Sequence, residues 1–387
     1  MNQKTVVVKL KEKSHDYKIE ISHNSLNACG EWTRKCLSST NKKTVVISNR
    51  KVFGLYGNTV KKSLENAGFE VVVWLMKDGE KHKSLRSLET ALKFFSEQKL
   101  TRNDAVIALG GGVVGDLAGF AAAIYLRGIA FLQIPTTLLA MIDSSVGGKT
   151  AVNSEFGKNL IGAFYQPEGV LIDVETLKTL PHRELTAGFC ESVKQGAISG
   201  IDLFGQTARF LENYSPDGFK KNFSDEKFIS DLKNIIAAQV SFKAEIVIGD
   251  DQENIGRIDA KSRKILNFGH TVGHALEKVT GYKHFKHGEA VGYGILAAGE
   301  IAKNVGIFEQ NELKSLNDVI GLVGKLPNTE NIDIKELIEA FEFDKKSVGK
   351  TLQWILLEGI GKPVIVNSEK IPAKILLKSL ETVLKNK

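Results

Sequence analysis

Short apolar runs alternate with segments of helical periodicity through the first half of the chain. Strands are expected at five of these runs, which are residues 45–47, 71–75, 104–109, 130–134 and 169–173. Between them, apolar side chains recur three or four positions apart, and this spacing predicts helices at residues 55–67 and 84–97. The alternation of strands and helices predicts a mostly parallel sheet with helices on both faces.

The pattern changes after about residue 175, where long helical segments replace the strands. Helices are expected at residues 181–198, 229–248, 267–280, 289–305, 310–319 and 334–341, with one strand at 351–357. We therefore predict an α/β domain at residues 1–176 and a mainly α-helical domain at residues 177–387. A cleft between two such domains is a common place for a binding site.

The charge of the chain is positive but is not concentrated in one segment. Among the 387 residues, 42% are hydrophobic and 25% are charged, as in ordinary globular proteins, and the formal net charge is +7. Lysine and arginine are spread along the chain without interleaved aromatic residues, so the sequence does not indicate nucleic-acid binding. The alternatives are a solvated surface and a set of cations that faces an anionic small molecule.

Targeting and redox features point to the cytoplasm. Residues 5–11 alternate between apolar and charged, which predicts a strand rather than the apolar core of a signal peptide. No apolar run is long enough to cross a membrane. Cys29, Cys36 and Cys190 are odd in number and have no CxxC spacing, which argues against a disulfide framework. We therefore expect a cytoplasmic protein that does not bind membranes.

A glycine-rich turn follows the strand expected at residues 104–109. Residues 110–115 read Gly-Gly-Gly-Val-Val-Gly and satisfy the G-x-G-x-x-G pattern at the start of a helix, which is a position suited to binding a pyrophosphate. The pattern departs from the usual dinucleotide fingerprint, because it does not follow the first strand and no acidic residue lies about 20 positions on. A tight strand-to-helix turn without a ligand is the alternative.

A second glycine pair occurs in Gly-Gly-Lys-Thr at residues 147–150. It is not a P-loop, because Asp143 stands where that motif has its first glycine. The surrounding residues are small and polar, so we interpret this segment as a binding loop.

One carboxylate and two imidazoles form a candidate metal site. Glu191, His270 and His287 each lie in a short block with glycines nearby. Three ligands of this kind suit Zn²⁺ and leave one coordination position open, as in catalytic sites. His274 lies four residues after His270, on the same helix face, and only one of the two needs to bind the metal; the other can carry protons. For any single histidine, a structural role is the alternative.

Several cations lie in otherwise apolar or glycine-rich blocks near these candidate ligands. Lys194 comes three residues after Glu191, which places a cation beside a carboxylate on one helix. The full set consists of Lys149, Lys158, Lys194, Lys243 and Arg263, with Asn159 and Asn267 as neutral hydrogen-bonding groups. Together they predict a substrate with several negative charges, such as a phosphate and a carboxylate.

These blocks resemble the 3-dehydroquinate synthase family over nearly the whole chain. The resemblance is carried by residues 109–120, 133–140, 143–150, 157–164, 266–275 and 287–291. The longest block reads Leu-Gly-Gly-Gly-Val-Val-Gly-Asp-Leu-Ala-Gly-Phe, and another reads Asn-Phe-Gly-His-Thr-Val-Gly-His. The chain departs from the family at Lys77-Asp78, where a proline is usual, and matches it only loosely at Ser48-Asn49.

The resemblance implies an enzyme with an α/β, Rossmann-like N-terminal domain plus a mainly α-helical C-terminal domain. It would be a homodimeric, phosphate-eliminating lyase of the shikimate pathway that uses NAD and Zn²⁺ (or Co²⁺). The substrate would be 3-deoxy-D-arabino-heptulosonate 7-phosphate, a phosphorylated sugar acid, and the products 3-dehydroquinate and phosphate. The implied steps are transient oxidation by NAD, phosphate elimination, re-reduction and an intramolecular aldol reaction.

The resemblance also assigns roles to individual residues. The metal ligands would be Glu191, His270 and His287. The catalytic residues would be Lys149, Lys194, Lys243, Arg263, Asn267 and His274. Further substrate contacts would come from Asp143, Lys158 and Asn159, from one of Lys345 and Lys346, with Lys345 favoured, and from Arg127 of the partner subunit. The NAD contacts would be Asn49, Glu80, Lys83, Gly111, Gly112, Asp116, Thr136 and Thr137.

Three other functions compete with this one. Another sugar-phosphate cyclase would act on a sedoheptulose phosphate or glucose 6-phosphate, but Lys243, Arg263, Asn267 and His274 keep the identities expected for the dehydroquinate reaction. A metal-dependent polyol dehydrogenase shares the glycine-rich turn, needs fewer anion-binding lysines and releases NADH. A binding protein without activity is disfavoured by the intact set of candidate ligands.

Overall fold

The computed structural model describes residues 16–251, 253–254, 256–348 and 352–385, with the side chains of 342–348 left out. The strand predicted at residues 5–11 lies outside these ranges. A six-stranded sheet in the order β1-β8-β5-β4-β2-β3 dominates the N-terminal half, and all its pairings are parallel. Its strands are β1 (Lys18–Ser22), β2 (Lys43–Asn49), β3 (Glu70–Met76), β4 (Ala105–Gly110), β5 (Ala130–Pro135) and β8 (Gly169–Asp173).

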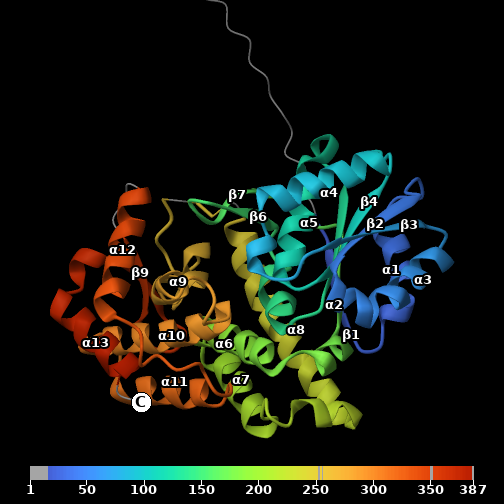
Figure 1. The fold of residues 1–387 in the computed structure, drawn as a ribbon. Coiled ribbons are helices and arrows are strands. Elements are labelled where there is room, and N and C mark those ends of the chain that lie inside the picture. The colour runs from blue at the N-terminus through green and yellow to red at the C-terminus, as the bar shows by residue number, and fades with distance from the viewer. Residues whose placement is uncertain (1–15, 252, 255, 349–351, 386–387) are drawn as a thin grey trace, which may run out of the picture.

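Helices cover both faces of this sheet, as the alternating pattern predicts (Figure 1). Along β2, Val46 packs into a core cluster with Leu64, whereas its neighbours Val45 and Ile47 pack with Phe95 and belong to the cluster on the other face. Because successive strand side chains point to opposite faces, a sheet covered on both sides needs apolar residues throughout its strands. The helices of this half are α1 (Cys29–Cys36), α2 (Arg50–Val52), α3 (Asn58–Asn66), α4 (Leu85–Glu97) and α5 (Gly112–Ile124).

An antiparallel hairpin, β6 (Lys149–Ser154) and β7 (Gly157–Phe164), stands apart from the sheet. The interpretation of residues 147–150 as a loop was therefore only half correct. Gly147 and Gly148 have φ of 99° and 65° and form a turn, but Lys149 and Thr150 already belong to β6. The hairpin approaches the helical half at α9, to which Lys158 is bonded through Glu277 (Figure 1).

The C-terminal half is mainly helical, which confirms the predicted fold class. Its helices are α6 (His182–Ser199), α7 (Ile201–Asn213), α8 (Glu226–Gly249), α9 (His270–Val279), α10 (His287–Asn304), α11 (Gln310–Gly321), α12 (Ile334–Val348) and α13 (Ala373–Lys385). Two antiparallel strands, β9 (Gln353–Leu357) and β10 (Pro363–Asn367), complete it. Helices α7 and α13 and strand β10 were not predicted from the sequence.

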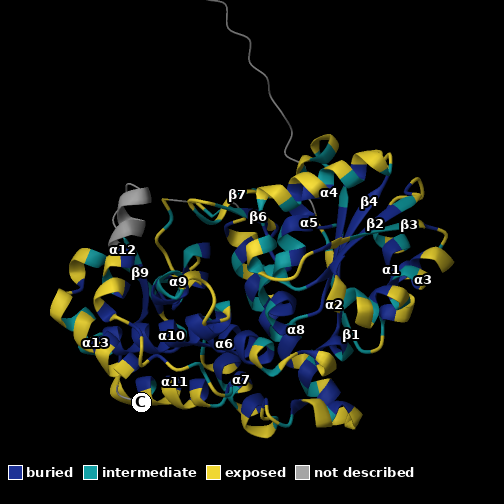
Figure 2. Ribbon diagram, in the orientation of Figure 1, coloured by how far each residue is buried: buried dark blue, intermediate teal, exposed yellow. Residues whose placement is uncertain are grey.

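Helix α10 is the centre of the helical half, because its residues from Gly288 to Ala302 are all buried (Figure 2). One large core cluster contains α10 and its neighbours and also includes Val170 and Ile172 of β8. The division into domains at residues 1–176 and 177–387 stays a prediction. Among the described helices, none is long and apolar enough to span a membrane.

Gly294 of α10 lets this helix approach the start of α9 closely. A Cβ atom at Gly294 would lie 1.8 Å from the carbonyl oxygen of Gly269, which has φ of 78° and immediately precedes His270. We expect Gly294→Ala to lower the free energy of unfolding by about 1–3 kcal/mol or more, as overpacking of a tight core does. Urea denaturation would measure this. Gly321→Ala is the matched control, because nothing lies within 4 Å of a Cβ there; equal stability of the two variants would contradict the prediction.

Candidate active site

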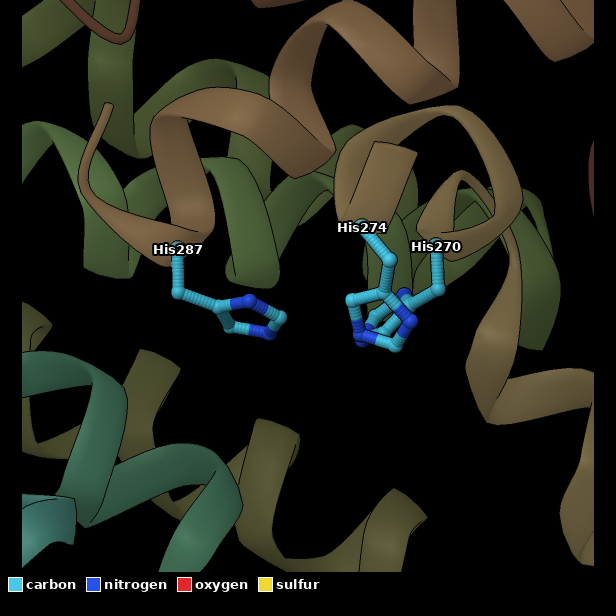
Figure 3. Close-up of side chains that lie close together, drawn as sticks. All are labelled: His270, His274 and His287. Carbon is cyan, nitrogen blue, oxygen red and sulfur yellow. The ribbon is translucent and has the colours of Figure 1, made fainter. Parts of the chain in front are cut away.

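Three histidines meet at the N-termini of two neighbouring helices. His270 is the first residue of α9, His274 lies one turn later, and His287 is the first residue of α10. Their side chains each place a ring nitrogen within 4.8 Å of the others. In Figure 3 the His287 ring points toward the rings of His270 and His274. The structure therefore brings together histidines that the sequence separates by up to 17 positions.

Glu191 of α6 completes this cluster from a third helix. Its Oε1 atom lies 3.9 Å from Nε2 of His270 and 3.6 Å from Nε2 of His287. The other nitrogen of each ring has an acceptor, since Nδ1 of His270 lies 3.2 Å from the carbonyl oxygen of Phe268 and Nδ1 of His287 lies 3.1 Å from Oε2 of Glu277. When each ring is neutral and donates from Nδ1, the lone pair of its Nε2 faces Glu191.

These three atoms fit a metal ion. Donor atoms about 2.1 Å from a tetrahedral zinc are about 3.4 Å apart, close to the Glu191–histidine separations seen here. Oε1 of Glu191 is buried and has no hydrogen-bond partner within the part of the chain that the structure describes. A buried carboxylate oxygen without a partner is unfavourable, and a cation would satisfy it. Burial and then the charge of Lys194 lower the pKa of His270 well below its usual value, so this ring is in the neutral form that binds metals.

Two buried lysines lie beside the cluster. Nζ of Lys194 is 2.5 Å from Oε2 of Glu191, and Nζ of Lys243 is 2.7 Å from Oδ1 of Asp143. Burial works against the ammonium form of Lys194, but the carboxylates of Glu191 and Asp143 outweigh it and raise its pKa. Burial lowers the pKa of Lys243, with Asp143 opposing it. Burial would raise the pKa of Asp143, yet Lys243 and Lys194 hold it well below the ordinary value.

Arg263 and Lys149 extend this positive region. Arg263 is 2% exposed, and its guanidinium donates to the carbonyl oxygens of Gly147 at 2.9 Å and Asp251 at 2.7 Å. Nζ of Lys149 lies 2.5 Å from Oε2 of Glu253, and half of its side chain is exposed. A group of lysine and arginine side chains, one of which contacts a candidate metal ligand, suits a bound molecule with several negative charges.

Lys158 of β7 and Glu277 of α9 connect the hairpin to the histidines. Nζ of Lys158 lies 2.9 Å from Oε1 of Glu277, whose other oxygen contacts His287. Burial opposes ionisation of Glu277, but the bond to His287, together with Lys158, lowers its pKa to about 2. Glu277 was missed in the sequence analysis. It lies three positions after His274, so the helical spacing from a candidate site residue was an available signal.

The glycine-rich turn lies at the point where the sheet changes direction. The chain runs from β2 to its neighbour β3 and then returns to β4 on the other side of β2, so the carboxyl ends of β2 and β4 flank a topological switch point. A Cβ at Gly112 would lie 2.8 Å from Oγ of Ser144, and one at Gly111 would lie 3.0 Å from Thr137. Both glycines are only partly buried at the start of α5, where the first N–H groups are free of intrahelical bonds. The glycines are therefore required by the close approach of Ser144 and Thr137, and the free N–H groups at the helix start suit a phosphate group.

Polar residues form a network beside this turn. Lys83 is only 4% exposed. Its Nζ donates to Oδ2 of Asp116 at 2.8 Å and to Oδ1 of Asn159 at 2.6 Å. Glu80 lies 3.4 Å from the same ammonium group. Burial opposes the charged form of Lys83, but Asp116 and Glu80 raise its pKa. The network therefore joins four of the predicted cofactor and substrate residues across three segments of the chain.

Models of 3-dehydroquinate synthase match most of the chain. The N-terminal model of that family matches residues 73–187, and the C-terminal model matches residues 188–347. The 3-dehydroquinate synthase of Rippkaea orientalis is 41% identical over 96% of this chain and 97% of the relative. That of Streptococcus pneumoniae is 39% identical over 91% of this chain and 94% of the relative. The chain belongs to the 3-dehydroquinate synthase family.

Solved structures of several other enzymes share the fold of this chain. 2-epi-5-epi-valiolone synthase from Streptomyces hygroscopicus, solved with NAD⁺ and Zn²⁺ bound, has a TM-score of 0.83 and 24% identity, over 98% of this chain and 99% of the other. Glycerol dehydrogenase from Schizosaccharomyces pombe has a TM-score of 0.62 and 18% identity, over 97% and 93% of the two chains. At these identities the similarity shows the fold. The predicted family and the predicted class of enzyme are confirmed.

For three further residues assigned from the family resemblance, the structure gives local contacts or exposure but no described contact with the histidine cluster. Asn49 is 8% exposed at the end of β2, where it accepts from the N–H of Val52 at 2.9 Å and donates to Asp78 at 3.1 Å. Thr136 is buried and donates its N–H to the carbonyl oxygen of Gly110 at 3.0 Å. Asn267 is exposed just before His270. Their roles stay predictions.

Two residues predicted to contact the substrate, Arg127 and Lys345, have no described contact with the histidine cluster. Arg127 is exposed after α5, with a φ of 66°. Its predicted role across a dimer involves a second subunit and stays a prediction. Lys345 lies in α12, but its side chain is outside the described residues.

Proposed function

We propose that the chain catalyses the 3-dehydroquinate synthase reaction, from 3-deoxy-D-arabino-heptulosonate 7-phosphate to 3-dehydroquinate and phosphate. The observation that carries the proposal is the position of Lys194. Its ammonium group is buried, and it contacts the same carboxylate that faces His270 and His287. A simple polyol carries no negative charge that this ammonium group could bind, whereas a phosphorylated sugar acid carries a phosphate and a carboxylate. Family membership supports the same substrate.

Zinc or cobalt would be held by Glu191, His270 and His287, and NAD by the turn at Gly111 and Gly112. When bound, the metal would polarise a substrate hydroxyl as a Lewis acid, and NAD would accept a hydride and later return it. Solved structures of two enzymes that share the fold contain NAD⁺ with Zn²⁺ or Co²⁺, which supports this pair of cofactors.

The protein's own side chains would mainly position the substrate. Lys194, Lys243 and Arg263 would hold the phosphate and carboxylate groups, since each is buried and positively charged when protonated. Their burial excludes water and strengthens these contacts relative to a surface site. His274 would carry protons between substrate and solvent, since it is exposed beside the candidate metal ligands and an imidazole can both accept and donate a proton.

We further propose a cytoplasmic homodimer in which Arg127 of one subunit reaches the phosphate bound by the other. The exposed position of Arg127 after α5 supports this role, because its side chain is available to a second subunit. No disulfide joins Cys29, Cys36 and Cys190, all three of which lie in the described part of the chain, and this agrees with a reducing compartment.

The function is tested by incubating the purified chain with the heptulosonate phosphate, zinc and a small molar fraction of NAD. We expect many equivalents of phosphate to be released without net accumulation of NADH, because NAD is regenerated in each turnover. Stoichiometric NADH without phosphate would instead indicate a polyol dehydrogenase. Turnover of a sedoheptulose phosphate or glucose 6-phosphate, with none of the heptulosonate phosphate, would indicate a different cyclase.

A further inference from the structure

Glu277 occupies a position between the candidate metal ligands and the hairpin. It is 3% exposed, and both of its carboxylate oxygens have a partner. Oε2 lies 3.1 Å from Nδ1 of His287, and Oε1 lies 2.9 Å from Nζ of Lys158. Its partners come from α10 and β7, so one buried side chain joins segments that are 10 and 119 positions away from it.

The bond to His287 determines which ring nitrogen can bind a cation. An ionised carboxylate only accepts hydrogen bonds, so Nδ1 of His287 must be the donor. Nε2, which lies 3.6 Å from Oε1 of Glu191, then keeps its lone pair in the neutral ring. His270 has the same arrangement with a weaker acceptor, the carbonyl oxygen of Phe268 at 3.2 Å from its Nδ1.

The bond to Lys158 fixes the other end of the carboxylate. The ammonium group of Lys158 also lies 4.4 Å from the centre of the Tyr282 ring, so it is held between an acidic and an aromatic side chain. A carboxylate with one oxygen on a lysine cannot rotate freely, and the second oxygen stays directed at His287.

We propose that Glu277 is a positioning residue for the metal centre, which orients the His287 ring toward Glu191 and tethers Lys158 of the hairpin to the same centre. This inference rests on the proposed metal site and adds to it a residue that does not itself bind the metal. An outer carboxylate of this kind both selects the ring tautomer and makes the imidazole a stronger donor, and its loss typically lowers metal affinity 10- to 100-fold.

The test is the zinc dissociation constant of the full chain, measured by competition with a chromophoric chelator in the absence of NAD and substrate. Glu277→Gln keeps the shape of the side chain but removes its charge, and we expect about 10- to 100-fold weaker zinc binding. With Co²⁺ in place of zinc, the visible absorption bands of the variant should shift, because the orientation of a ligand changes. Thermal unfolding of the metal-free proteins, measured in parallel, separates this effect from a general loss of stability.

Two control variants define the role. Glu300→Gln removes the charge of a different buried carboxylate, in α10. Glu300 lies thirteen residues after His287, or about 20 Å along the helix, so this variant should bind zinc within threefold of the wild type. Lys158→Gln removes the other partner of Glu277 and should weaken zinc binding less than Glu277→Gln does. If Glu277→Gln does not fold, Glu277→Asp replaces it, and we expect an intermediate affinity.

The proposal is overturned if the Glu277 variant binds zinc within threefold of the wild type. It is also overturned if the Glu300 control loses as much affinity, since the effect would then follow general stability. If Lys158→Gln lost as much zinc affinity as Glu277→Gln, the loss would be due to the ion pair between Glu277 and Lys158 rather than to the orientation of His287. Failure of the wild-type chain to bind zinc is a different result, because it would remove the proposed metal site itself.

Discussion

Replacing His270 with alanine is expected to abolish stoichiometric zinc binding and to lower turnover at least about 1,000-fold. Nε2 of His270 is one of the three atoms that converge on the candidate metal position, 3.9 Å from Oε1 of Glu191. Two ligands hold zinc much less tightly than three. Loss of the Lewis acid removes several kcal/mol of transition-state stabilisation, and each 1.36 kcal/mol is a factor of about ten in rate. Metal content per chain and the rate of phosphate release measure the two effects.

His284→Ala is the matched control for this prediction. His284 is exposed, lies three residues before His287 and bonds to the carbonyl oxygen of Asn328 at 2.7 Å, away from the cluster. We expect this variant to keep one zinc per chain. Zinc retained at full stoichiometry in His270→Ala would contradict the ligand assignment.

His274 distinguishes two possible ligand sets. The three histidines lie close enough to bind a cation without Glu191. However, the buried oxygen of Glu191 faces Nε2 of both His270 and His287, and this favours the set that contains the carboxylate. We therefore expect His274→Ala to keep zinc and lose turnover, and Glu191→Gln to lose zinc. The reverse pair of results would replace Glu191 with His274 as the third ligand.

Five of the six strands of the sheet were predictable because they are short, mostly apolar runs, whereas β1 reads Lys-Ile-Glu-Ile-Ser and was not among the five. In β4 and β8 every residue is buried, and such runs differ clearly from the helices between them. The hairpin was missed for the opposite reason. In β7 the residues are exposed or half-buried, with Lys158 and Asn159 among glycines, so no apolar pattern distinguishes it from a loop. Helix α13 and strand β10 were missed although their sequences carry a signal. Leu376, Leu380 and Val383 of α13 recur three or four positions apart, and β10 contains the apolar run Val-Ile-Val.

The candidate site was predictable where its residues lie in recognisable blocks. Glu191, Lys194, His270 and His287 were all assigned from the sequence, and the structure places them together. Glu277 was not assigned, because its role depends on Lys158, a partner 119 positions away. Sequence spacing within one helix gives the face on which a residue lies, but not what approaches that face from another part of the chain.

Lys194→Met is expected to have the second large effect, on both stability and turnover. The side chain of Lys194 is 1% exposed and Glu191 is fully buried, with 2.5 Å between Nζ and Oε2. Removing one partner of a buried ion pair leaves an unpaired charge and costs about 3–5 kcal/mol of unfolding free energy. Urea denaturation in the presence of a chelator measures this loss. Turnover should fall by about 100- to 1,000-fold, as is typical when one buried donor to a reacting group is removed.

Zinc should restore part of the stability of Lys194→Met, because a bound cation would again compensate the charge of Glu191. The matched control is Lys303→Met. Lys303 is also the third residue after its partner, Glu300, in a helix, with 3.2 Å between Nζ and Oε1, but a third of its side chain is exposed. Solvent screening limits such a pair to about 0–1 kcal/mol. If both variants lost a similar amount of unfolding free energy, burial would not be the reason that the Lys194–Glu191 pair stabilises the protein. Full turnover in Lys194→Met would remove this lysine from the active site.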